Sequence, residues 1–99
     1  MSFIVKLIPF SRYKIVGHSM EPTVKDGQVV WVNRWAYLLS QPQVKDIVLF
    51  KLGDKFFVKR IIQVKKAEYL LSGDNRQDSL DSRQFGFVQQ KDIVGKVRI

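Results

Sequence analysis

Hydrophobic and polar residues alternate along most of this 99-residue chain, with the period of two that is typical of strands. The clearest run, 55–64 (KFFVKRIIQV), places Phe57, Lys59 and Ile61 on one face of a predicted strand. Shorter runs rich in β-formers predict further strands at 13–16, 28–32, 46–51, 69–72, 85–88 and 93–97.

Turn-forming residues separate these runs at 25–27, 41–42, 53–54 and 73–75. The pair Gly53-Asp54 between two β runs predicts a hairpin. Residues 33–40 predict the one short helical turn. Many brief strands at close spacing indicate a mainly β fold, a small antiparallel barrel or half-barrel. The length suits a single domain over residues 1–99.

The composition narrows the choice of partners and chemistry. Seventeen Lys and Arg against nine Asp and Glu give a net charge of +8, which favours anionic partners. The basic residues are spread along the chain, so a solvated basic surface is favoured over a nucleic-acid face. The absence of cysteine excludes disulfides and thiolate chemistry, and a single histidine disfavours a zinc site. No apolar run approaches the roughly 20 residues of a membrane span, and we expect neither an anchor nor a cleavable leader.

The segment 17–23 (GHSMEPT) is the first candidate for chemistry. A serine at a strand end beside a glycine leaves room for a peptide backbone to approach the hydroxyl of Ser19. Pro22 restricts the exit of the loop. On its own, this segment is equally well explained as a plain turn.

Lys59 is the second candidate, because its same-face neighbours are Phe57 and Ile61. If that face is buried, loss of hydration favours the neutral amine, which can act as a general base. The alternative is an ordinary strand lysine whose amine reaches the surface.

The third segment, 73–86 (GDNRQDSLDSRQFG), crowds acids, arginines and serines behind a glycine turn. Such a loop can fold on its own charge pairs and side-chain hydrogen bonds to the backbone. A calcium loop built on Asp74, Asp78 and Asp81 is the competing interpretation. Their spacing, and the arginines among them, fit a hard-cation site poorly.

Together these segments resemble the successive sequence boxes of the type I signal peptidases, in that family's order. The matching stretches are GHSMEPT (17–23), KDIVLF (45–50), VKRII (58–62) and GDNRQDSLDSRQFG (73–86). The resemblance covers residues 13–97, which it makes the peptidase core, and leaves 1–12 as an N-terminal lead-in. It implies a serine–lysine dyad peptidase and supports the β half-barrel fold.

The resemblance also implies roles for single residues. Ser19 matches the nucleophile and Lys59 its general base, while Ser79 matches the serine that orients the lysine. Gly17 occupies the oxyanion position, where the common bacterial members carry a hydroxyl residue. Structural charge pairs are implied for Arg60, Asp74, Asp81 and Arg83. We expect no catalytic role for His18, because adjacent side chains of an extended segment point to opposite sides.

Substrate recognition in this family is by addition of the peptide as an extended strand. The positions that match its groove and pocket walls are Ile15, Val16, Met20, Val24, Phe57 and Val58. We expect a protein substrate, no cofactor, no metal and no nucleic acid.

The chain departs from typical signal peptidases in two ways. We expect no membrane helix, whereas those enzymes carry one or two. In addition, only residues 63–72 separate the lysine box from the last box, whereas those enzymes have a second β domain inserted between the two boxes. This minimal layout resembles the nickel-type superoxide dismutase maturation proteases. We predict a cytoplasmic serine endopeptidase that removes a short N-terminal leader or propeptide. The alternatives are a signal-peptidase-like enzyme at the membrane periphery and a non-catalytic peptide-binding module.

Overall fold

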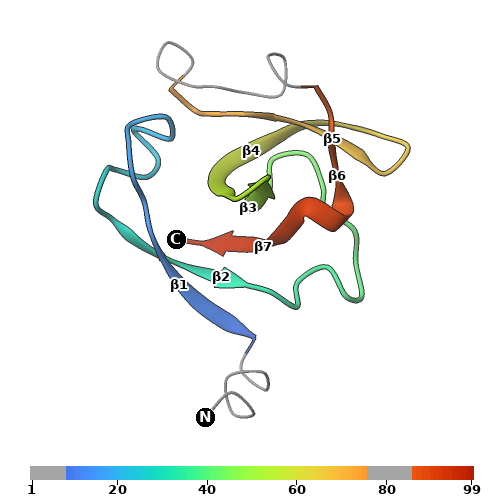
Figure 1. Ribbon diagram of the computed structural model, residues 1–99, viewed down its shortest axis with the longest axis horizontal. Coiled ribbons are helices and arrows are strands. Elements are labelled where there is room, and N and C mark those ends of the chain that lie inside the picture. Colours follow the sequence, from blue (N-terminus) through green and yellow to red (C-terminus); the bar gives the residue numbers. More distant parts are fainter. Residues whose placement is uncertain (1–8, 76–85) are drawn as a thin grey trace.

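A computed structural model describes residues 9–75 and 86–99 of the chain. Within them, one antiparallel sheet contains seven strands in the order β1-β2-β7-β3-β4-β5-β6, and it curls around the centre of the view in Figure 1. The elements are β1 (Phe10–Lys14), β2 (Val29–Asn33), β3 (Ile47–Leu52), β4 (Lys55–Lys65), β5 (Glu68–Ser72), β6 (Val88–Gln89), the 3₁₀ helix η1 (Gln90–Asp92) and β7 (Ile93–Arg98). The predicted mainly β class is confirmed, and the sheet is open, with β1 and β6 as its edges.

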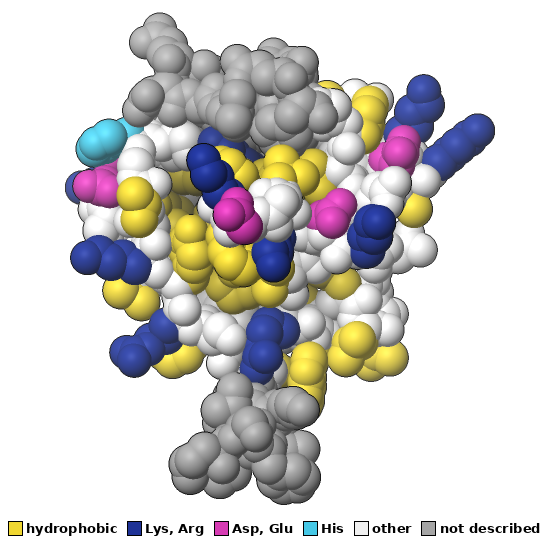
Figure 2. All heavy atoms as spheres, in the orientation of Figure 1, with side chains coloured by type: hydrophobic (Ala, Val, Ile, Leu, Met, Phe, Trp, Pro, Cys, Tyr) yellow, Lys and Arg dark blue, Asp and Glu magenta, His cyan; other side chains and the backbone are white. Residues whose placement is uncertain are grey.

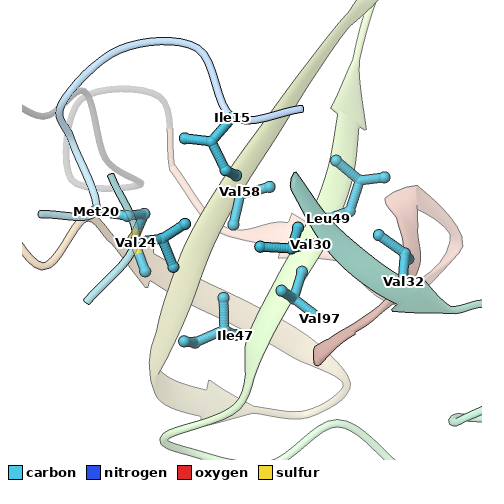
Figure 3. Close-up of a cluster of buried hydrophobic side chains, with 9 residues drawn as sticks. All are labelled: Ile15, Met20, Val24, Val30, Val32, Ile47, Leu49, Val58 and Val97. Atoms are coloured by element: carbon cyan, nitrogen blue, oxygen red, sulfur yellow. The ribbon is translucent and has the colours of Figure 1, made fainter. Parts of the chain in front are cut away.

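The central strand β3 is buried on both faces of the sheet, as four consecutive buried residues show. Ile47 and Leu49 belong to one hydrophobic cluster, and Val48 and Phe50 belong to a second one on the opposite face. Figure 3 shows the first cluster, which is formed by Ile15, Met20, Val24, Val30, Val32, Ile47, Leu49, Val58 and Val97. The second is formed by Val48, Phe50, Ile61, Tyr69, Leu71 and Val88.

Most strand predictions hold to within one or two residues at the ends, and the Gly53-Asp54 hairpin is confirmed by the pairing of Leu52 with Lys55. The first strand was placed wrongly: β1 covers 10–14 rather than 13–16, because its whole length pairs with β2. The predicted strand 85–88 shrinks to β6, with residue 85 outside the described part. The helix η1 was not predicted.

The predicted helical turn at 33–40 is wrong. The structure has consecutive turns there, because the Asn33 side chain accepts a hydrogen bond from Trp35 N at 3.0 Å and so competes with helical pairing. In addition, Leu38 and Leu39 point to solvent, so the segment has no apolar stripe to bury.

A tight turn lies at each end of β4: the Gly53-Asp54 turn precedes the strand, and a second one follows it. Strand β4 is followed directly by β5, with Lys66 and Ala67 as a two-residue turn, both at positive φ, between the paired residues Lys65 and Glu68. No inserted domain separates these strands, as we expected from the short stretch 63–72.

Candidate active site

Ser19 lies in the loop between β1 and β2, and this loop is anchored by apolar side chains. Met20 and Val24 are fully buried in the first cluster, on either side of a turn in which Val24 N donates to Met20 O at 3.0 Å. Gly17 enters the loop at φ +96°, a conformation that a side chain disfavours. The serine is therefore held at the surface by residues packed beneath it.

Lys59 lies in the middle of β4 and is buried, with only 3% of its surface exposed. Its same-face neighbours are the ones that the alternating pattern predicted: Ile61 is fully buried, and the Phe57 ring stacks on Phe50 with centroids 5.6 Å apart. Burial disfavours the charged form of a lysine, so this environment has the property that a lysine base requires. The condition that we set for a lysine base, a buried environment around Lys59, is met.

Ser19 and Lys59 line the same small cavity, of about 50 Å³. Its wall is completed by Tyr13, Ile15, Val16, Met20, Phe56, Phe57 and Val58. Five of the six residues predicted for substrate binding are therefore in this wall. The sixth, Val24, does not line the cavity and packs in the core beneath the loop.

A polar cluster, which we call the clamp, ties the Ser19 loop to the neighbouring strands; its members are Thr23, Arg60, Asp74 and Asn75. The Asp74 carboxylate accepts two hydrogen bonds from the Arg60 guanidinium, both at 2.9 Å, and a third from the Thr23 hydroxyl. Hydrogen bonding to Arg60 holds the pKa of Asp74 below its ordinary value, and Thr23 acts in the same direction. Since Arg60 follows Lys59 in β4, the clamp couples the lysine strand to the serine loop.

Asn75 completes the clamp through the backbone of the loop. The backbone N–H of Asn75 donates to Ser19 O at 2.8 Å, and its side-chain Nδ2 donates to His18 O at 3.1 Å. These carbonyls precede and follow the Ser19 Cα in the backbone, so a residue 56 positions later in the chain helps to hold Ser19 in place.

Gly17 and His18, the two residues before the serine, also make local contacts. The Gly17 amide donates to Asp26 Oδ1 at 2.8 Å, so it is not available to an oxyanion in this conformation. His18 Nδ1 lies 2.7 Å from Glu21 Oε2, and this hydrogen bond lowers the pKa of Glu21. The imidazole of His18 is not part of the cavity wall.

Some predicted residues lie outside the described part of the chain, namely Ser79, Asp81 and Arg83, and their predicted roles stay predictions. The structure does place Arg60 and Asp74 in the charge pair that we expected. Asp74 is occupied by Arg60 and Thr23, which leaves it poorly suited to the calcium interpretation; Asp78 and Asp81 are not described. Within residues 9–75 and 86–99, no group of three His, Cys, Asp or Glu side chains could hold a metal ion.

Sequence reasoning missed three residues at this site: Phe56 in the cavity wall, and Thr23 and Asn75 in the clamp. Tyr13, which also lines the cavity, begins the segment 13–16 that the resemblance places beside the groove. Thr23 and Asn75 both belong to segments that we singled out, so their motif membership was a usable signal. Alternation places Phe56 on the opposite face of β4 from Lys59, yet both residues line the cavity.

Comparison with known proteins decides the family. A family model described as signal peptidase, peptidase S26, matches residues 1–64 and 62–99. The chain belongs to the signal peptidase family. Its relatives include signal peptidase I V of Bacillus subtilis, 28% identical over 145 residues that cover 94% of this chain and 86% of the relative. Signal peptidase IB of Staphylococcus aureus strain Mu50 is 29% identical over 151 residues, covering 96% and 79%.

These alignments are longer than the chain itself, so the signal peptidase relatives contain residues with no counterpart here. The two parts of the family match meet at residues 62–64, near the end of β4. The family to which the chain belongs is one of serine peptidases. Over the described residues, no helix has the length and apolar character needed to cross a membrane.

Proposed function

We propose that this signal peptidase relative is a serine endopeptidase in which Ser19 is the nucleophile and Lys59 the general base. The observation that carries the proposal is the shared cavity: a buried lysine and a loop serine border the same space of about 50 Å³. A desolvated lysine can be neutral near physiological pH and then accept the proton of a serine hydroxyl.

The reaction follows from these two groups. Lys59 Nζ takes the proton of Ser19 Oγ while Oγ attacks the scissile carbonyl, which forms a tetrahedral intermediate. The resulting ammonium then gives its proton to the leaving amine as the peptide bond breaks. A water molecule, deprotonated by the same amine, hydrolyses the ester and regenerates Ser19.

The developing oxyanion requires hydrogen-bond donors that are free in the resting site. The Ser19 amide is the backbone donor in the proposed geometry. The Gly17 amide is bound to Asp26, and Gly17 has no hydroxyl, so a second donor has to come from another group or from water. Lack of one donor typically lowers the rate by about 10²–10³-fold.

The substrate is an extended peptide with small side chains next to the scissile bond. A strand added beside the cavity would form backbone hydrogen bonds, and the size of the cavity would exclude large side chains. We propose that the natural substrate is a protein with a short N-terminal leader or propeptide, with the precursor of a nickel-type superoxide dismutase as the first candidate. The direct β4–β5 turn, which resembles the minimal layout of that branch, supports this choice.

Single substitutions test the dyad. Ser19→Ala and Lys59→Ala should each abolish cleavage of such a precursor, followed by mass spectrometry, while circular dichroism shows an intact fold. Lys59→Met preserves the volume of the buried side chain if the alanine variant unfolds. Lys65→Ala, an exposed lysine at the end of the same strand, is the matched control and should cleave normally. Full activity in Lys59→Met would refute the dyad, and inactivity of the parent chain on every precursor would favour the peptide-binding module.

The pH profile gives an independent test. A lysine base is active only when neutral, so kcat/KM should rise with pH as the amine loses its proton. His18→Gln should leave the profile unchanged. A limb near the ordinary histidine pKa of about 6.5 that disappears in His18→Gln would contradict the assignment.

A further inference from the structure

Lys45, just before β3, has a strained backbone next to the strand that carries Lys59. Its φ of +84° lies in the left-handed region, which a residue with a side chain disfavours. Lys45 N donates to Ile61 O, and Ile61 N donates to Asp46 O, both at 2.8 Å. Two consecutive residues therefore oppose one residue of β4, and the first has a positive φ, which is the arrangement of a G1 bulge. Such strain persists only where the surrounding contacts hold it.

The side chain of Asp46 holds this bulge in place. Its Oδ2 accepts hydrogen bonds from the Tyr37 hydroxyl at 2.7 Å and from Gln43 N at 3.1 Å. In return, Asp46 N donates to Gln43 O at 3.0 Å, so the turn that contains Lys45 is closed from both sides. Lys96 Nζ of β7 lies 3.6 Å from Asp46 Oδ1. One carboxylate thus joins the bulge to the loop after β2 and to β7.

Tyr37 is itself fixed by the core. Its ring packs against the second cluster, which includes Phe50 and Ile61. Burial, together with the hydrogen bond to Asp46, raises the pKa of Tyr37, so the phenol stays a neutral donor. Phe57, a same-face neighbour of Lys59, packs against the same cluster. The contact of Tyr37 with Asp46 therefore connects the bulge to the packing around Lys59.

The carbonyl of the bulge reaches the clamp. Arg60 Nη1 donates to Lys45 O at 2.9 Å, while Nε and Nη2 of the same guanidinium donate to Asp74. The guanidinium is therefore held from two sides. Both carboxylates of this network, those of Asp46 and Asp74, have a cationic partner, in keeping with the mixture of acidic and basic side chains on the face shown in Figure 2.

We propose that Asp46 is a positioning residue for the dyad: through the bulge at Lys45 it fixes Arg60, and Arg60 fixes both members of the dyad. Lys59 precedes Arg60 in β4, and the Ser19 loop is bound to the same clamp. The proposal rests on the proposed function and adds a third segment to the support of the site. Its reason is geometric, since a displacement of about 1 Å can lower the rate by about 10²-fold.

Kinetics of two Asp46 variants test this role. Asp46→Ala removes the acceptor, and we expect kcat to fall about tenfold while KM changes less than about twofold. Asp46→Asn keeps an acceptor of the same size and should retain most of the activity. Asp92→Ala, which removes an acid from η1, is the control and should cleave normally. Unchanged kcat in Asp46→Ala would overturn the proposal.

The pH profile separates positioning from a loss of folded protein. A displaced Lys59 is better hydrated and keeps its proton to higher pH, so the midpoint of the rise in kcat/KM should move to higher pH in Asp46→Ala. A smaller folded fraction alone would lower kcat/KM without moving the midpoint, and that result would make the role of Asp46 merely structural.

Glycine at the bulge provides a rescue. Glycine adopts a positive φ without strain, so Lys45→Gly should restore kcat severalfold in the Asp46→Ala background. Lys45→Ala in that background is the matched control, because alanine keeps the strain, and it should restore nothing. Equal rates in the two double variants would contradict the assigned part of the bulge.

Hydrogen exchange at Arg60 Nε–H tests the contact without a substrate. The resonance is measured by NMR in the full chain and identified by its loss in Arg60→Lys. We expect exchange about tenfold faster in Asp46→Ala than in the parent chain, and no change in Asp92→Ala. Unchanged exchange in Asp46→Ala would overturn the proposal. If the parent chain cleaves no precursor, the proposed function fails, and the exchange rates still decide whether Asp46 fixes Arg60.

Discussion

Two long loops of the described sheet, between β1 and β2 and between β2 and β3, are stabilised in different ways. The Ser19 loop, between β1 and β2, buries Met20 and Val24 and is tied by the clamp to residues more than fifty positions away. The loop after β2 has its leucines in solvent, and most of its side-chain hydrogen bonds reach near neighbours, such as the one that Ser40 Oγ donates to Ala36 O at 3.0 Å.

This difference matches the task that we propose for the Ser19 loop. A nucleophile has to be held in place, since a displacement of about 1 Å can lower the rate by 10²-fold. The contrast predicts that the Ser19 loop depends on specific polar contacts and that the other tolerates substitution outside the contact of Tyr37 with Asp46, provided that the strands beneath it are intact.

The largest loss of stability is expected from a substitution in β7, the strand that pairs with β2 beneath the second loop. A Cβ at Gly95 of β7 would lie 2.5 Å from Asn33 O, so Gly95→Ala forces β7 away from β2. Because the contact is with backbone, we expect a loss of about 3 kcal/mol in the free energy of unfolding, measured by urea denaturation. Gly53→Ala, at φ +61° but in open space, is the control, with a loss of about 1 kcal/mol. Equal losses would mean that the close approach is unimportant.

The second largest effect is expected when the clamp loses its central carboxylate, that of Asp74. Asp74→Ala removes the partner of Arg60 and Thr23, and we expect a loss of about 2 kcal/mol of stability, since both groups of the ion pair are partly exposed. Cleavage should fall about 100-fold as the Ser19 loop shifts. Asp92→Ala in η1 serves as a control and should change neither quantity. If Asp74→Ala keeps full activity, the clamp does not position the nucleophile.

Low pH should weaken the ion pair between Asp74 and Arg60. The folded protein holds the pKa of Asp74 below its ordinary value because Arg60 donates hydrogen bonds to the carboxylate. The stabilisation is therefore present above the pKa of the unfolded chain, near 3.9, and is lost as the pH falls through the lower, folded value. Denaturation midpoints from pH 6 downward should fall less in Asp74→Asn than in the parent chain. Parallel curves would show that Asp74 is not responsible.

A smaller effect is expected from Thr23, because only one hydrogen bond is lost. Thr23→Val keeps the shape of the side chain but removes the hydroxyl that donates to Asp74. We expect a loss of about 1 kcal/mol and a severalfold fall in kcat, with KM little changed. The comparison is Ser40→Ala in the other loop, whose hydroxyl bonds only to a nearby carbonyl and whose removal should leave cleavage unaltered.

The smallest effect completes the comparison. Leu38→Ser/Leu39→Ser changes side chains that are already in solvent, so the free energy of unfolding should stay within about 0.5 kcal/mol of the parent value. Thermal melting checks this, together with cleavage of a soluble peptide. A clear loss of stability would mean that these leucines pack against the protein in solution and are not a free surface.

Local patterns were sufficient to predict most of the sheet. Alternation in 55–64 identified β4 and the buried face of Lys59, and Gly53-Asp54 identified the hairpin. The prediction of a helical turn at 33–40 was wrong because the exposed Leu38 and Leu39 give a helix no apolar face to bury. The first strand was placed wrongly because its position depends on the pairing of residues 10–14 with β2. Propensity carries little information about such partners.

The sequence by itself determined the candidate chemistry, because a nucleophile motif, a lysine between apolar neighbours and the family's last box can each be read within a few residues. Only the tertiary structure decided which of these segments come together in space. It placed Ser19 and Lys59 on one cavity, joined Thr23 to Asp74 across 51 positions, and left Trp31 and Trp35 about half exposed. Hydrogen-bond partners and exposed faces depend on how a sheet curls and which strands become neighbours, and those are properties of the whole chain.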